Sequence, residues 1–165
     1  MNKQICIIDY GIGNLLSIKR AIDKLGYQGI VTNKKNIILD SSHIILPGVG
    51  AFGKAMESIK ELELDKILIE CGEKNKFILG ICLGMQLLCG ESQEFQFNKG
   101  LNLIPGKVIP LKNIVDKKKI KFPNIGWHKI KRTIGRTNNK LDNQISQNES
   151  FYFIHSFVAV TNKEF

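Results

Sequence analysis

The most chemically suggestive segment is Gly-Ile-Cys-Leu-Gly at residues 80–84, which places the thiol of Cys82 between two glycines. This is the cysteine form of the GxSxG nucleophile elbow, in which small residues allow a turn sharp enough to expose a nucleophile at a strand end. In such elbows the amide of the next residue, here Leu83, donates a hydrogen bond to the oxyanion. The alternative is a buried cysteine that only packs. A predicted strand before Cys82 and a helix after it favour the elbow, and therefore acyl-transfer chemistry.

A second glycine turn, Pro-Gly-Val-Gly-Ala-Phe at residues 47–52, follows another apolar run. Taken alone it is ordinary turn chemistry. In a parallel sheet, however, neighbouring strands open at their carboxyl ends on the same crevice. The backbone amides of this turn are therefore expected to face Cys82 and to supply a second oxyanion donor.

The elements that must position these turns alternate between strand and helix. Apolar runs of strand length and stretches of helical period follow each other as in parallel βα units. The pattern predicts strands at 5–8, 29–32, 43–46 and 77–82, helices at 15–25, 51–70 and 85–89, and a polar loop after residue 32. After residue 100 it predicts strands at 107–111, 126–131 and 150–160. The fold class is therefore α/β, with a mostly parallel sheet and a mixed or antiparallel extension.

Length and composition agree with one globular domain. The chain has 165 residues, a net charge of +9 and 43% hydrophobic residues, which is enough for a sizeable core. Its four cysteines form no CxxC pair, and no segment reads as a signal peptide or a membrane span. These features predict a cytoplasmic protein with reduced thiols and no metal site.

The positive charge permits several kinds of partner but selects none. The lysines at 117–119 read as a solvated loop, because no aromatic residues are interleaved with them as in nucleic-acid-binding surfaces. The Gly-Ile-Gly at 11–13 lacks the third glycine and the acidic residue of a dinucleotide-binding motif. We therefore expect the protein to bind neither nucleic acid nor a membrane, and to need no cofactor.

Five sequence blocks in order carry a resemblance that spans residues 5–160. They are DYGIGN at 9–14, PGVGAF at 47–52, GICLGMQ at 80–86, PNIGW at 123–127 and YFIHSF at 152–157. Together they closely resemble the glutaminase subunits of imidazole glycerol phosphate synthases, which are class I (triad) glutamine amidotransferases. The resemblance implies a flavodoxin-like, doubly wound fold and a heterodimer with a (β/α)8-barrel cyclase.

The resemblance also implies roles for individual residues. Cys82 would attack the side-chain amide of L-glutamine, form a glutamyl thioester and release ammonia, which the cyclase uses in histidine biosynthesis. Gly50 and Leu83 would provide the amides of the oxyanion hole, and Gln86, Ser156 and Phe157 would line the glutamine site. The surface facing the cyclase or its signalling path would include Asn14, Trp127 and Tyr152.

One departure from the family concerns the rest of the triad. The family has a His and a Glu, two residues apart, downstream of the block at 152–157, and no such pair follows it here. We therefore expect residues 1–165 to form a single amidotransferase domain that is incomplete at its C-terminus and nearly inactive alone. None of the three histidines (His43, His128 and His155) is assigned as the base.

Two other functions are compatible with this sequence. A paralogous amidotransferase that supplies ammonia for surface-sugar synthesis is suggested by the basic balance and by His128, where the family more often has Asn. The missing base also makes a catalytically silent, partner-binding module a possibility.

Overall fold

The structure of the chain is a computed structural model that describes residues 4–115, 122–130, 145–146 and 149–161. The lysines at 117–119, read above as a solvated loop, lie outside these residues. The chain divides into two compact units, Met1–Ile109 with Val158–Phe165, and Pro110–Phe157.

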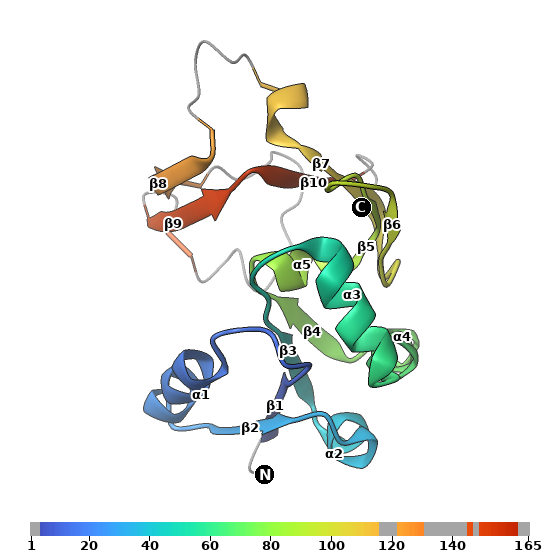
Figure 1. Ribbon diagram of the computed structural model, residues 1–165. Helices are drawn as coiled ribbons and strands as arrows, with labels where there is room; N and C mark the ends of the chain where they lie inside the picture. The colour runs from blue at the N-terminus through green and yellow to red at the C-terminus, as the bar shows by residue number, and fades with distance from the viewer. Residues whose placement is uncertain (1–3, 116–121, 131–144, 147–148, 162–165) are drawn as a thin grey trace. The chain divides into compact units, whose positions relative to one another are not determined.

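The first unit contains a four-stranded parallel sheet in the order β2-β1-β3-β4 (Figure 1). Its strands are β1 (Gln4–Ile8), β2 (Gln28–Thr32), β3 (His43–Leu46) and β4 (Phe77–Gly80). The chain runs outward from β1 to β2 and then returns past β1 to β3, so the strand order reverses between β1 and β3. Ligands of open α/β sheets bind at this kind of switch point, beyond the carboxyl ends of the strands. The turns after β1, β3 and β4 all lie at that edge.

Five α-helices follow these strands: α1 (Leu15–Lys24), α2 (Lys35–Asp40), α3 (Phe52–Glu61), α4 (Leu64–Glu73) and α5 (Leu83–Leu87). Helix α1 packs against β1 and β2, while α2 contacts β1 and α4. Because parallel crossovers are right-handed, reversing the direction of travel places α1 and α2 on opposite faces of the sheet (Figure 1). The sheet is therefore doubly wound, as predicted. Among the helices in the described ranges, none combines the length and the apolar character that crossing a bilayer requires.

A second, mixed sheet has the order β10-β7-β5-β6. It consists of β5 (Cys89–Ser92), β6 (Asn98–Lys99), β7 (Ile104–Pro110) and β10 (Phe157–Thr161). Strand β5 pairs antiparallel with β6 and parallel with β7. In the second unit, the 3-10 helix η1 (Leu111–Asn113) precedes an antiparallel pair of β8 (Asn124–Lys129) and β9 (Ser150–His155). The predicted mixed or antiparallel extension is confirmed.

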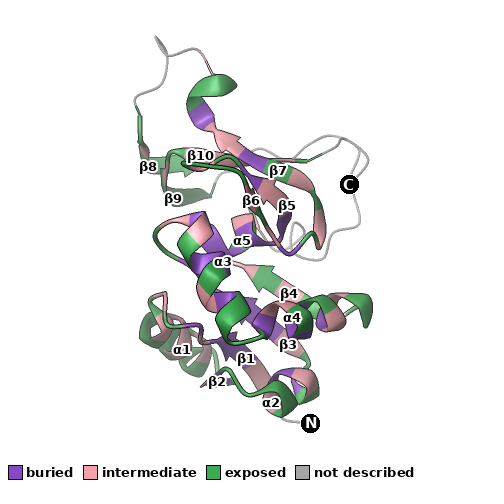
Figure 2. Cartoon of the chain, turned by 45° about the vertical axis from the view of Figure 1, so that its right-hand side comes forward, coloured by how far each residue is buried: buried purple, intermediate pink, exposed green. Residues whose placement is uncertain are grey.

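Burial follows the layered architecture of the first unit. Strands β1 and β3 provide much of the core, whereas helix α1 has no fully buried residue (Figure 2). Strand β4 lies at the edge of its sheet and is more exposed, with Phe77 at 64% and Leu79 at 47%. The carboxyl end of β3 is nevertheless buried through Leu46 and Pro47, so the turn beside the elbow rests on a packed base.

Several predicted element boundaries were wrong: β4 ends at Gly80 rather than at residue 82, and β7 and β8 begin at Ile104 and Asn124 rather than at residues 107 and 126. The single helix predicted over 51–70 is two helices, because Glu63 adopts a left-handed conformation (φ 53°) between α3 and α4. The polar loop after β2 contains α2, which buries Ile38. The helix after the elbow ends at Leu87, and Cys89 begins β5. The strand predicted over 150–160 is interrupted at Ser156.

Candidate active site

Cys82 occupies a strained turn between β4 and α5. Its backbone has φ 55° and ψ −119°, and its side chain is exposed. A non-glycine residue in such a sparsely populated region costs on the order of 1 to 3 kcal/mol and is a feature of functional sites. The turn is held by hydrogen bonds from the Ile81 amide to the Leu46 carbonyl (3.0 Å) and from the Gly84 amide to the Ile81 carbonyl (3.0 Å). Residues 80–84 therefore form the predicted elbow.

The two glycines of the elbow are required by close backbone approach. A Cβ on Gly84 would overlap the carbonyl oxygen of Leu46, and one on Gly80 would overlap the backbone of Met85. These neighbours are backbone atoms of packed elements, which cannot move aside as the end of a flexible side chain can. The glycines allow α5 to begin directly against the end of β3, which leaves Cys82 at the tip of the turn.

The turn after β3 packs against the same elbow. A Cβ on Gly48 would lie 2.7 Å from the Gly84 nitrogen and 2.9 Å from Leu83 Cβ. Two residues further on, Gly50 is exposed and has φ 86°, a conformation that glycine adopts without strain. The structure thus brings the β3 turn and the elbow together at the carboxyl edge of the sheet.

Two backbone amides in these turns have no acceptor among the described residues, one in the buried Leu83 and one in the exposed Gly50. Within the described part of the chain, neither the Leu83 amide nor the Gly50 amide donates a hydrogen bond to another protein group. Gln86 lies one helical turn after Cys82 and is half-buried, and its amide donates to the Cys82 carbonyl (3.3 Å). An oxyanion hole is built from unpaired N–H groups of this kind beside a nucleophile.

The turn after β1 completes this edge of the sheet. The Asp9 carboxylate accepts a hydrogen bond from the Gly11 amide (3.0 Å), and the Asn14 side chain caps helix α1 by accepting from the Ser17 amide (3.3 Å). Between them, the buried hydroxyl of Tyr10 donates to the Pro47 carbonyl (2.7 Å). The sequence motif included Tyr10, but no local pattern links it to a residue 37 positions away.

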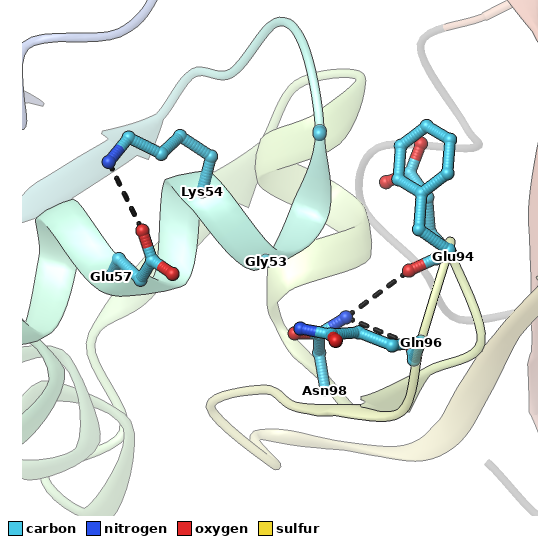
Figure 3. Close-up of a pocket in the computed structure, with 8 residues that line it drawn as sticks. Gly53, Lys54, Glu57, Glu94, Gln96 and Asn98 are labelled. Atoms are coloured by element: carbon cyan, nitrogen blue, oxygen red, sulfur yellow. Dashed lines mark hydrogen bonds and ion pairs between the residues drawn. The ribbon is translucent and has the colours of Figure 1, made fainter.

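A loop after β5 secures the other end of the β3 turn. The Glu94 carboxylate accepts a hydrogen bond from the Phe52 amide (2.6 Å) at the start of α3, where an anion complements the helix dipole. The Asn98 side chain donates to the Glu94 and Gln96 carbonyls and shapes this loop (Figure 3). The loop and the first turn of α3 line a pocket of about 150 Å³. Glu94 was not identified from the sequence, because its partner is 42 residues away.

Ser156 and Phe157 belong to the second unit. The Ser156 carbonyl accepts a hydrogen bond from the Leu111 amide (2.9 Å), and Phe157 is half-buried. His155 lies beside them, with Nδ1 2.9 Å from the Phe157 carbonyl and Nε2 2.9 Å from the Asn124 side-chain nitrogen. With Nδ1 protonated, His155 donates to Phe157 and accepts from Asn124, so both of its ring nitrogens are engaged.

Trp127 and Tyr152 face each other across the β8–β9 pair. Their rings meet edge to face with centroids 5.6 Å apart, and both side chains remain exposed, at 71% and 53%. Asn14 is also exposed, at the start of α1 in the first unit. All three residues assigned to a partner surface are therefore solvent-accessible.

The rings of the other two histidines each contact a phenylalanine ring. His43 opens β3, and its ring stacks on Phe77 at the start of β4, three residues before that strand ends at Gly80. It therefore lies at the opposite end of this strand pair from the elbow. His128 is exposed on β8 and makes an edge contact with Phe153. In the described ranges, no group of three or more His, Cys, Asp or Glu side chains is arranged to hold a metal ion.

The four thiols differ sharply in their environment. Burial raises the pKa of Cys6 to about 12, with a smaller contribution from Cys71 that outweighs the opposing hydrogen bond from Ser41. Burial is also the main cause that raises the pKa of Cys71 and of Cys89. A raised pKa keeps these three thiols protonated and unreactive at pH 8, and only Cys82 is exposed.

We therefore expect one thiol to react rapidly with Ellman's reagent in the native protein at pH 8, and all four to react after denaturation. The Cys82→Ala variant should have no rapidly reacting thiol. Rapid reaction of two or more native thiols would contradict the burial of Cys6, Cys71 or Cys89.

Comparisons with known proteins agree with this geometry. The family model described as glutamine amidotransferase class-I matches residues 6–165. The imidazole glycerol phosphate synthase subunit HisH of Bacillus cytotoxicus is 41% identical over 155 residues, which are 94% of this chain and 70% of the relative. The HisH subunit of Chlorobium chlorochromatii is 41% identical over 157 residues, which are 95% of this chain and 75% of the relative.

Solved structures with low sequence identity share the fold. A glutamine amidotransferase crystal structure matches with a TM-score of 0.66 at 16% identity, covering 96% of this chain and 74% of the other. PurLQS from Thermotoga maritima matches with a TM-score of 0.67 at 17% identity, covering 99% of this chain and 72% of the other. The predicted flavodoxin-like α/β fold is confirmed. The chain belongs to the class-I glutamine amidotransferase family and is a glutamine amidotransferase.

Proposed function

We propose that this chain is the glutaminase subunit of an imidazole glycerol phosphate synthase and delivers ammonia to a (β/α)8-barrel cyclase in histidine biosynthesis. The observation that carries the proposal is the exposed, strained Cys82 in an elbow against which the turn carrying Gly50 packs; among the described residues, the amides of Leu83 and Gly50 donate to no protein group. The names of the relatives supply the pathway. Four free cysteines support a reducing, cytoplasmic location.

In the proposed reaction, the Cys82 sulfur attacks the side-chain carbonyl carbon of L-glutamine. The amides of Leu83 and Gly50 donate to the oxygen that becomes negatively charged in the tetrahedral intermediate. The intermediate collapses as the C–N bond breaks, ammonia leaves and a γ-glutamyl thioester remains. Water then hydrolyses the thioester to glutamate and regenerates the thiol. Gln86, Ser156 and Phe157 are proposed to line the glutamine site.

The first step needs a base to take the thiol proton, and departing ammonia needs an acid. We assign neither role to a histidine of this chain. His43 is at the wrong end of its strand, both ring nitrogens of His155 are engaged, and only Cys82 lies in a catalytic motif. The His and Glu of the family's triad are therefore proposed to lie outside residues 1–165.

The partner surface is proposed to include Asn14, Trp127 and Tyr152. Exposed aromatic side chains such as those of Trp127 and Tyr152 are enriched at protein interfaces, where they bury a large apolar area. Because the two rings are in edge-to-face contact, a partner would meet both side chains together. The partner would be the barrel subunit that consumes the ammonia.

The test compares two proteins, one expressed from the complete gene and one limited to residues 1–165, each with and without the cyclase subunit. We expect the complete protein to support formation of imidazole glycerol phosphate from glutamine, and residues 1–165 to leave only ammonia-dependent synthesis. Full turnover by residues 1–165 would place the base among the three histidines. Glutamine hydrolysis without transfer to this cyclase would favour the surface-sugar pathway, and no hydrolysis by the complete complex would favour a silent module.

A further inference from the structure

The β3 turn carries one proposed oxyanion donor, yet little in its own sequence holds it in place. Gly48 and Gly50 are conformationally permissive, and Pro47 has no N–H with which to anchor itself. Glycine has no Cβ, so the turn's own side chains at these positions do not restrict the rotation of its peptide planes. The orientation of the Gly50 amide must therefore depend on contacts from outside the turn.

Tyr10 provides such a contact at the start of the turn. Its hydroxyl, on a side chain only 2% exposed, donates to the Pro47 carbonyl at 2.7 Å. Burial raises the pKa of Tyr10 well above its usual range, and the negative charge of a Cys82 thiolate raises it further. The hydroxyl therefore remains protonated and keeps its role as donor.

The same hydroxyl lies where the β3 turn meets the elbow. A Cβ on Gly48 would be 2.8 Å from the Tyr10 oxygen, 2.7 Å from the Gly84 nitrogen and 2.9 Å from Leu83 Cβ. Tyr10 thus reaches from the end of β1 into the contact between the turn after β3 and the helix that begins at Leu83.

We propose that Tyr10 is a positioning residue for glutamine hydrolysis: its hydrogen bond to Pro47 holds the 47–50 turn so that the Gly50 amide points at the developing oxyanion. The inference rests on the proposed function of that turn. Tyr10 touches neither glutamine nor the reacting atoms in this role. Loss of the Tyr10 hydrogen bond weakens stabilisation of the transition state and leaves the Cys82 thiol in place.

The test is Tyr10→Phe in the protein expressed from its complete gene and assayed with the cyclase. We expect kcat for glutamate release to fall by about 10- to 100-fold, because misplacing or losing one oxyanion donor has effects of this order. KM should stay within about threefold. The rate of Cys82 alkylation by iodoacetamide should stay within about twofold, because the elbow is held by its own backbone contacts.

Ser41→Ala is the matched control. The Ser41 hydroxyl is also buried and donates to a backbone carbonyl, that of Ile37 (2.7 Å), at the end of α2 and away from the elbow. Both variants should lower Tm by roughly 2 to 8 °C, as expected for loss of a buried hydrogen bond in a protein of this size. Only Tyr10→Phe should lower kcat.

A parental kcat in Tyr10→Phe, despite a lowered Tm, would show that Tyr10 is only structural and would overturn the inference. An equal fall in kcat and in the alkylation rate would also overturn it, because Tyr10 would then act on the elbow. If Tyr10→Phe does not fold, 4-fluorophenylalanine at position 10, which fills the place of the hydroxyl without donating a hydrogen bond, should show the same loss of kcat. Failure of the proposed function is seen separately, as parental glutamine hydrolysis by Cys82→Ala.

Discussion

Replacement of Cys82 by alanine is expected to abolish glutamine-dependent product formation by the complete complex with the proposed cyclase partner. Removing the nucleophile of a covalent mechanism eliminates the acyl-enzyme route, so glutamate release should fall by at least about 10³-fold. Synthesis from added ammonia should continue at the parental rate, because the proposed function places the acceptor site in the cyclase. The two activities are measured side by side, as glutamate release and as imidazole glycerol phosphate formation.

Cys89→Ala is the control for this prediction. Cys89 follows the same short helix but is fully buried at the start of β5, and burial raises its pKa. Its variant should lose some stability and retain glutamine hydrolysis. If Cys82→Ala retained the parental rate while Cys89→Ala lost it, the nucleophile would be misassigned.

A third substitution tests the backbone strain at Cys82. Glycine adopts positive φ without strain, so Cys82→Gly should be more stable than Cys82→Ala by about 1 kcal/mol. Urea unfolding of the two inactive proteins measures the difference. Equal stability would mean that the left-handed conformation at residue 82 carries no strain.

Gly84→Ala is the second change from which we expect a large effect. The new methyl group would overlap the Leu46 carbonyl oxygen at the buried end of β3, and neither backbone can yield without displacing the elbow. We expect a loss of about 3 kcal/mol or more in the free energy of unfolding. Glutamine hydrolysis should fall at least about 100-fold, because a displacement near 1 Å is enough for such a loss.

Gly72→Ala is matched to this change, because Gly72 also lies in a helix, α4, and also has a close neighbour. That neighbour is a terminal methyl of Leu103, which can turn away. Alanine also favours a helix over glycine by about 1 kcal/mol, which offsets the adjustment. Stability should change by no more than about 1 kcal/mol and activity should be retained. Similar losses in both variants would show that the elbow has no special steric requirement.

The fold class and the elbow around Cys82 were predictable because both depend on short-range patterns. Alternation of apolar runs with helical periods predicted the βα units, since each element must bury its own apolar face. The pentapeptide around Cys82 predicted the elbow, since glycine spacing and a strand-to-helix junction are local properties. Element boundaries were less predictable where a single backbone conformation decides them, as at Glu63 between α3 and α4.

The sequence by itself determined the parallel α/β architecture, the exposed thiol of Cys82 and the turn that carries Gly50. Only the tertiary structure decided how that turn is held, through Tyr10 from the turn after β1 and Glu94 from the loop after β5. These hydrogen bonds join residues 37 and 42 positions apart, and no local propensity records such a pairing. It arises only when parallel pairing brings the carboxyl ends of β1, β3 and β4 to one edge and the loop after β5 reaches the start of α3.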